Sequence, residues 1–297
     1  MKHNLLSLKY FLSVATAKSI ARAADAEHIA ASAISKRISE LESQLGTPLF
    51  YRQTTGVELT AAGHEMVHYA KSIVQLIERM DAHMSDFASG LRGTVRIAAN
   101  TSAITQFLPE DLAGFAQAHP DMRIDLTELT SEDILTNVRE GLADIGIYSG
   151  LVPDPDLNVM TYRRDTLVVV MALDHPFKSD VPVTLEEFSR FDMVGLQRGS
   201  SLQAFLDICA RERELKLKSR VEVLSFDGVR RMVEAGLGIA VLPHGAVEPY
   251  LESSRLRMIP IAEPWAIREL KLALKDSQSV SRPVRALVDW LVPENLA

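Results

Sequence analysis

Residues 31–46, ASAISKRISELESQLG, restrict the fold of this chain more than any other segment. Four apolar residues recur at i, i+4, i+7 and i+11 and predict a helix with one buried stripe: Ile34, Ile38, Leu41 and Leu45. A second face carries small hydroxyl groups and a cation: Ser32, Ser35, Lys36 and Ser39. Gly46 and Pro48 then end the helix, because glycine suits a C-terminal cap and proline cannot continue a helix. This narrow polar face suits the major groove of DNA, although an exposed polar face is also the ordinary surface of a helix.

The segments on either side of this helix favour the DNA-binding interpretation. A short run of small residues, IARAADA, follows Ser19, which can serve as its N-cap, and a turn separates the run from the longer helix. After that helix, the runs LFYR and VELT are typical of two short strands around a turn that contains Gly56. A hairpin directly after a recognition helix is a wing, and Arg52 at its base could contact a phosphate.

The run FLSVATAKSIARAADAEHIAASAISKRISELESQLGTPLFYRQTTGVELTAAG resembles the winged helix-turn-helix of LysR-type transcriptional regulators. The resemblance lies in the ordered motifs SIARAA, SAISKRISELESQLGTPLF and LTAAG. It implies a DNA-binding domain over residues 1–60, with the helix-turn-helix from Ile20 to Ser39. We expect the DNA-contacting residues to be Ser32, Ala33, Ser35, Lys36, Arg37, Ser39, Arg52 and Thr54.

Residues 61–89 are predicted to form one long linker helix, because Thr60 can cap it and no proline interrupts it. Apolar residues alternate four and three positions apart and form a heptad seam: Met66, Ala70, Ile73, Ile77, Met80, Met84 and Phe87. A seam on an otherwise polar helix between two domains is typical of self-association. We therefore predict that the linker helix pairs two copies of the chain.

The same helix contains HEMVH, a match to the pattern H-E-x-x-H. In one class of hydrolases the two histidines of this pattern bind zinc and the glutamate acts as a general base. His64 and His68 fall on the outer face of the predicted helix, away from the seam, with Glu65 between them. No further histidine follows at the spacing that would supply a third ligand. We expect no metal, no cofactor and no catalytic residue, and a zinc hydrolase is the least favoured alternative.

Beyond SGLRG, strands and helices alternate along residues 93–297. This order predicts an α/β domain with a parallel sheet covered on both faces. The pattern indicates two lobes: lobe 1 over about 93–162 and 268–297, and lobe 2 over about 163–267, with crossovers near Tyr162 and Arg268. It resembles the two-lobed, periplasmic-binding-protein-like effector domain of the same family, most recognisably in ADIGIY and VEAGLGIAVLP.

Three hydroxyl pairs follow predicted strands and precede predicted helices, where free backbone amides favour polar or anionic ligands. They are Thr101 and Ser102, Thr130 and Ser131, and Ser200 and Ser201. Simple N-capping explains such pairs equally well, but their repetition in both lobes favours a pocket whose walls include Tyr148 and Phe226. Arg198 is the one cation beside a pair. For this family a small carboxylate is the default effector, and an uncharged polar ligand remains an alternative.

Charge and composition agree with this interpretation without requiring it. The formal net charge is −7, but residues 1–60 hold seven basic against five acidic side chains, so the negative excess lies elsewhere. Cys209 is the only cysteine, and Lys9 and Lys18 interrupt the N-terminal apolar run, so we expect a cytoplasmic protein with no disulfide and no membrane partner.

The predicted function is sequence-specific binding to a partly palindromic promoter site, controlled by a small molecule between the lobes. The resemblance further implies a dimer or tetramer, a change in DNA bending, and contact with RNA polymerase. An alternative is a solute-binding receptor whose N-terminal helices serve only to form a dimer.

Overall fold

The computed structural model describes residues 4–53, 56–89, 93–150, 155–197, 199–275 and 280–293. The chain divides into two compact units, Met1–Ala88 and Ser89–Ala297. In the described residues no helix has the length and the hydropathy that a membrane crossing requires.

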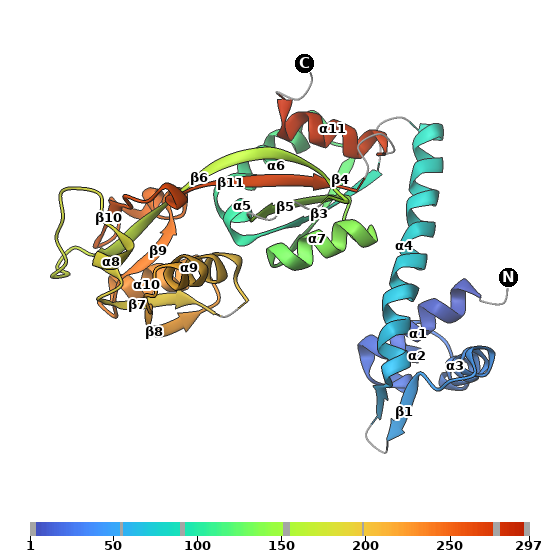
Figure 1. Ribbon diagram of the computed structural model, residues 1–297. Coiled ribbons are helices and arrows are strands. Elements are labelled where there is room, and N and C mark those ends of the chain that lie inside the picture. Colours follow the sequence, from blue (N-terminus) through green and yellow to red (C-terminus); the bar gives the residue numbers. More distant parts are fainter. Residues whose placement is uncertain are drawn as a thin grey trace. The chain divides into compact units, whose positions relative to one another are not determined.

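The first unit is a three-helix bundle followed by a hairpin and a long helix (Figure 1). Its elements are α1 (Leu5–Ala17), α2 (Ile20–Ala26), α3 (Ala31–Leu45), β1 (Phe50–Gln53), β2 (Gly56–Leu59) and α4 (Ala61–Ser89). Ser19 caps α2 by accepting a hydrogen bond from the Arg22 amide, and Gly46 ends α3 at φ 71°, a left-handed conformation that glycine adopts without strain. The predicted order of elements in this unit is therefore confirmed.

The apolar stripe of α3 forms the centre of this unit's core. Ile34, Ile38 and Leu41 are almost completely buried and pack with Phe11 of α1. Leu45, the last member of the predicted stripe, is instead 36% exposed at the end of the helix.

The second unit is an α/β domain built around a mixed sheet in the order β10-β6-β11-β5-β3-β4, with β9 also paired to β6. The strands are β3 (Gly93–Ala99), β4 (Met122–Glu128), β5 (Ile145–Ser149), β6 (Asn158–Ala172), β9 (Ala240–Pro243), β10 (Leu256–Pro260) and β11 (Ile267–Leu274). β7 (Asp192–Leu196) and β8 (Lys218–Val223) form a separate parallel pair. The helices are α5 (Thr101–Gln106), α6 (Leu108–Ala118), α7 (Ser131–Glu140), α8 (Leu185–Phe188), α9 (Ser201–Glu212), α10 (Phe226–Glu234) and α11 (Arg282–Leu291). Short 3-10 helices are η1 (His244–Ala246), η2 (Glu248–Tyr250) and η3 (Pro264–Ala266).

Both faces of the first lobe's sheet are covered by helices, as the alternation of elements predicts. The helix α7 lies on one face, and α6 and α11 lie on the other (Figure 1). On β3, Ile97 and Ala99 pack on the side of α6 and α11, whereas Ala98 packs against Ile134 and Val138 of α7. The two-lobed fold class is thus confirmed.

The two crossovers between the lobes are β6 and β11. Thr166 of β6 still pairs with Ile267 of β11, whereas the next residue, Leu167, pairs with Pro243 of β9. One continuous strand therefore serves both lobes, and the first crossover falls about four residues after Tyr162, where the sequence placed it. The second crossover, at Ile267, is one residue from the expected Arg268. The strand β10 and the short helix α5 were not predicted.

Candidate DNA-binding and ligand-binding sites

The predicted recognition face of α3 lies at the surface of the first unit. Ser32, Ala33 and Ser39 are exposed, and Ser35 and Arg37 are half-buried beside the apolar stripe. The Lys36 side chain is 77% exposed, and its Nζ lies 4.0 Å from Glu40 Oε1 one turn later. An exposed pair at this distance is weak, so Lys36 can exchange Glu40 for another partner at little cost.

The hairpin is fixed to α3 and to the end of α1 by specific hydrogen bonds. Glu42 Oε1 on α3 accepts from the amides of Leu49 and Phe50 at 2.8 and 3.2 Å. The Val57 amide donates to the Lys18 carbonyl at 3.2 Å. A Cβ at Gly56 would collide with that same carbonyl at 2.6 Å, so this close approach requires glycine. Recognition helix and wing are therefore held in one rigid geometry.

Two predicted DNA-contacting residues lie on or beside the wing. Arg52 stands on β1, where its backbone pairs with Val57, and Thr54 lies outside the described residues.

The apolar face of α4 differs in part from the predicted seam. Ala70 is completely buried and Met66 partly buried, because both pack in the core of the first unit. Ala70 therefore has no exposed side-chain surface, Met66 and Ile77 are half-buried, and the side chains of Met84 and Phe87 lie outside the described residues. Four apolar side chains at spacings of four, three and four residues are exposed instead, and we call them the α4 stripe: Tyr69 (58%), Ile73 (42%), Leu76 (58%) and Met80 (54%). Ile73 and Met80 belong to both sets. The exposed face is therefore turned around the axis of α4 by less than the angle between two neighbouring residues.

The histidines of HEMVH stand on the surface of α4. His64 and His68 are exposed, and the ring of His68 lies edge-on to Tyr69 at a centroid distance of 6.1 Å. Within the described part of the chain no three histidine, cysteine or acidic side chains are grouped as a metal site would need.

Hydroxyl side chains from both lobes meet in a cavity of about 360 Å³, which we call the polar cavity. Six of the eight residues expected at the effector site line it: Thr101, Ser102, Thr130, Ser200, Ser201 and Phe226. Asn100, Glu128, Asp133 and Gln197 also line it, and none of them was predicted. Of the described lining residues, none is a lysine or an arginine, and Arg198 lies outside the described residues.

Some of these hydroxyl groups cap helices and also line the polar cavity. Thr130 and Ser200 cap α7 and α9 by accepting from the amides of Asp133 and Gln203 at 3.2 and 3.4 Å. The helix α5 is capped by Asn100 rather than by the predicted Thr101 pair. Thr101 is then free to donate to Glu128 Oε1 at 2.6 Å. Asparagine is a preferred N-cap, and that preference could have identified this residue in the run AANTSA.

A second cavity, of about 810 Å³, lies between α7, α9 and the crossover strand β11, and we call it the hinge cavity. Tyr148 and Ser131, the remaining two expected effector residues, line it, while Thr130 and Ser201 border both cavities. The Ser131 amide donates across the lobes to Ser201 Oγ at 2.8 Å. This bond marks the boundary between the two cavities.

A buried ion pair joins the two crossover strands beside these cavities. The guanidinium of Arg268 on β11 pairs with Asp165 on β6, and their side chains are 6% and 0% exposed. Arg268 also donates to Ser102 Oγ of α5 at 3.3 Å, and its guanidinium lies 6.0 Å from the ring of Phe205 on α9. Arg268 therefore contacts both crossovers and a helix from each lobe.

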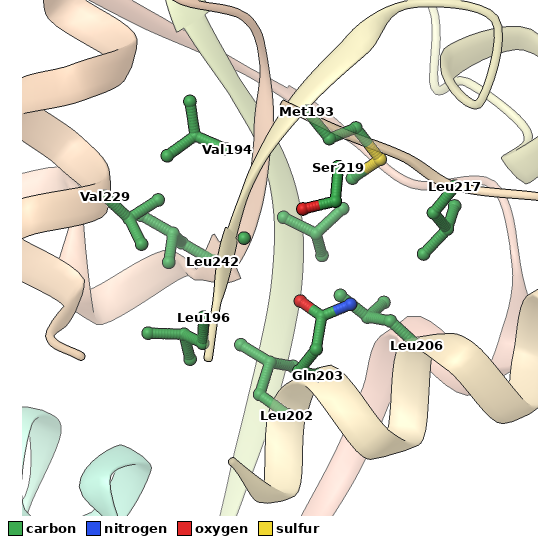
Figure 2. Close-up of a pocket in the computed structure, with 12 residues that line it drawn as sticks. Met193, Val194, Leu196, Leu202, Gln203, Leu206, Leu217, Ser219, Val229 and Leu242 are labelled. Atoms are coloured by element: carbon green, nitrogen blue, oxygen red, sulfur yellow. The ribbon is translucent and has the colours of Figure 1, made fainter. Parts of the chain in front are cut away.

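Lobe 2 contains a third, much smaller gap between β7, β8 and α9. Figure 2 shows Gln203 and Ser219 as polar side chains among leucines, valines and Met193. Its volume, about 10 Å³, is at the lower limit for one water molecule, so it belongs to the packing of the lobe. Cys209 nearby is buried, and burial raises the pKa of its thiol, which opposes a nucleophilic role.

Together these features define a class of protein: a winged-helix unit with an exposed recognition face, joined through a long helix to a two-lobed ligand-binding unit. Family models match both units: the description "Bacterial regulatory helix-turn-helix protein, lysR family" covers residues 5–64, and "LysR substrate binding domain" covers residues 88–295. The chain belongs to the LysR family of transcriptional regulators, as its sequence motifs indicate.

Full-length relatives have the same organisation. The chain is 26% identical to a "Probable RuBisCO transcriptional regulator" of Synechocystis sp. over 97% of this chain and 85% of that one. It superposes with a TM-score of 0.76 on CbnR "complexed with the target DNA complex", at 19% identity and with 98% and 99% of the two chains covered. The CcmR regulatory domain of Synechocystis, solved "in complex with 2-PG", matches at a TM-score of 0.62 and 23% identity, over 69% of this chain and 99% of that one.

Proposed function

We propose that this protein binds a partly palindromic promoter site as a dimer and alters transcription when a small molecule occupies its two-lobed unit. The observation that carries the proposal is the exposed serine and lysine face of α3, fixed to the hairpin through Glu42. The DNA-bound structure of the similar regulator CbnR supports the nucleic-acid partner. The homologous regulators support a role in transcription rather than in catalysis.

In this proposal each element has a separate task. The α3 face reads base edges in the major groove, and the hairpin contacts phosphates. The α4 stripe pairs two copies and sets the spacing of their recognition helices. The polar cavity receives a small polar effector, which closes the lobes and changes how dimers associate, bend DNA and admit RNA polymerase. Binding to chromosomal DNA would also agree with the expected cytoplasmic location of the protein.

The first test measures binding to the DNA that flanks the protein's own gene, by fluorescence anisotropy and with a random duplex as competitor. We expect tight, specific binding that weakens as salt is raised, because phosphate contacts release counterions. The receptor alternative predicts no difference between the two duplexes, and that result would exclude the proposed function.

Base reading by α3 gives a second expected result. Lys36→Ala and Ser35→Ala should each weaken specific binding by about 1–3 kcal/mol and leave binding to random DNA nearly unchanged. Lys9→Ala, which removes an exposed lysine from α1, is the matched control and should leave specific binding intact. An equal loss on specific and random duplexes would show that the α3 face does not read bases.

Arg52 on β1 should behave differently from the α3 residues. Arg52→Ala is expected to weaken specific and random binding by a similar factor, because a phosphate contact carries no sequence information. A plot of log affinity against log salt concentration should become shallower by about one unit. A loss confined to the specific duplex would instead assign Arg52 to base recognition.

A further inference from the structure

The proposed function leaves the motif HEMVH on α4 without a task. His64 and His68 are four residues apart, and side chains at this spacing lie on one face of a helix with Cβ atoms roughly 5–6 Å apart. Both histidines are exposed, so their rings can reach a dissolved ion. Two imidazoles at this spacing on a helix can bind the same metal ion.

The backbone that carries the first histidine is fixed by the start of the hairpin. Thr60 Oγ1 donates to the Pro48 carbonyl at 2.8 Å and accepts from the Gly63 amide at 2.9 Å. A Cβ at Gly63 would lie 2.1 Å from the Leu49 carbonyl oxygen, so the first turn of α4 packs tightly on this segment. The His64 amide donates to the Thr60 carbonyl at 2.9 Å. Ligands on such a fixed element lose little conformational freedom when they bind an ion.

The charged side chains next to the pair have opposite signs. Glu65 is exposed and precedes His68 by three residues, so its carboxylate lies near that ring and attracts a cation held there. Lys71 is exposed and follows His68 by three residues, so its ammonium group repels the same cation. These neighbours should therefore tune the affinity in opposite directions.

Two histidines define an exchangeable metal site rather than a structural or catalytic one. Structural zinc sites have four protein ligands and catalytic zinc sites have three. Among the described residues no three metal-binding side chains are grouped in this way, so water would fill the remaining positions around an ion. Imidazole suits Cu²⁺, Ni²⁺ and Zn²⁺, whereas Mg²⁺ prefers oxygen ligands.

The pair occupies a different face of α4 from the α4 stripe. With about 3.6 residues per turn, the two histidines lie about 110–150° around the helix from the centre of that stripe. Pairing of two copies through the stripe therefore does not by itself cover the two rings. The metal site does not depend on whether two copies pair.

We propose that His64 and His68 form an exchangeable site for one divalent transition-metal ion, and that the bound ion ties the first two turns of α4 together. Each ring supplies one nitrogen, and Cu²⁺ binds more tightly than Ni²⁺ or Zn²⁺. The ion stabilises the start of α4 because it binds the folded helix more tightly than the unfolded chain. This departs from the expectation of no metal, which followed from the missing third ligand.

Isothermal titration calorimetry on the full-length protein without an affinity tag tests the inference. The probes are Cu²⁺, Ni²⁺ and Zn²⁺, with Mg²⁺ as the control ion. Every protein carries His3→Gln and His83→Gln, because the side chains of these two histidines lie outside the described ones. We expect one Cu²⁺ per chain, weaker binding of Ni²⁺ and Zn²⁺, and none of Mg²⁺. Electron paramagnetic resonance of the Cu²⁺ complex should show coupling to two nitrogen nuclei.

Single substitutions locate the site. His64→Gln and His68→Gln should each weaken Cu²⁺ binding at least about tenfold and reduce the coupling to one nitrogen, because a single imidazole cannot chelate. His28→Asn removes an exposed histidine from the turn before α3 and is the matched control, which should leave the affinity unchanged. Glu65→Gln should weaken binding about two- to threefold, and Lys71→Gln should strengthen it by a similar factor.

Hydrogen exchange tests the effect on the helix. Zn²⁺ should slow exchange of the amides of residues 65–68, and it should not do so in His64→Gln. Three results would overturn the inference: no binding of any of the three ions at submillimolar concentration, equal affinity with and without either histidine, or a loss in His28→Asn as large as in His68→Gln. Unchanged exchange in the saturated protein would refute the link between the two turns. DNA binding is measured separately by anisotropy, so these outcomes leave the proposed function untouched.

Discussion

Leu76→Asp is expected to convert the protein from a dimer to a monomer and to reduce specific DNA binding by about 10²–10⁴-fold. Loss of dimerisation removes the gain in effective concentration that comes from holding two half-sites together. Leu76 is 58% exposed at the centre of the α4 stripe, whose four apolar side chains are each between 42% and 58% exposed. Sedimentation equilibrium measures the mass, and anisotropy on the full operator measures the binding.

Lys71→Asp is the matched control for this substitution. Lys71 is exposed on the opposite side of α4, so the same new carboxylate should leave both the mass and the affinity unchanged. If Leu76→Asp remains dimeric, the pairing surface is not the α4 stripe. If Lys71→Asp also dissociates, the effect comes from helix charge rather than from the stripe.

The second large effect is expected at the ion pair between the crossovers. Asp165→Ala should lower the free energy of unfolding of the second unit by about 3–5 kcal/mol, because it leaves the Arg268 guanidinium buried without its counter-charge. Asp165→Asn is the gentler variant and should produce a smaller loss in the same direction. Urea denaturation followed by circular dichroism provides the measurement.

The same two strands supply the control. Arg164 and Glu269 form an exposed pair, with side chains 77% and 44% exposed, and Glu269→Ala should cost at most about 1 kcal/mol. The double replacement Asp165→Leu with Arg268→Met should recover most of the loss, since a buried ion pair can often be exchanged for apolar packing. Equal effects of Asp165→Ala and Glu269→Ala would show that burial of the first pair contributes nothing special.

Much of the fold could be predicted because its elements carry strong local signals. The periodic stripe of α3, its Gly46 stop and the alternation of strands with helices each depend on neighbouring residues alone. The hydroxyl pairs could be predicted to lie close together because the carboxyl ends of parallel strands in such folds meet at one edge of the sheet.

What failed depended on tertiary contacts. Periodicity placed Ala70 on the predicted seam, whereas its side chain packs in the core of its own unit, because periodicity cannot tell whether an apolar helix face meets another subunit or its own domain. The sequence could place the first crossover only near Tyr162, because nothing local distinguishes the two halves of the continuous strand β6. The hinge cavity was missed because Phe205, Trp265 and Arg268 meet only once α9, η3 and β11 are packed.

The continuity of β6 has a consequence for how the second unit melts. Its first half completes the sheet of one lobe and its second half completes the other, without a loop between them. Unfolding of one lobe therefore frees one end of the strand on which the ladder of the other lobe depends. Heating should therefore give a single calorimetric transition for residues 89–297 rather than one for each lobe, and a stabiliser bound in either half should raise the melting temperature of both.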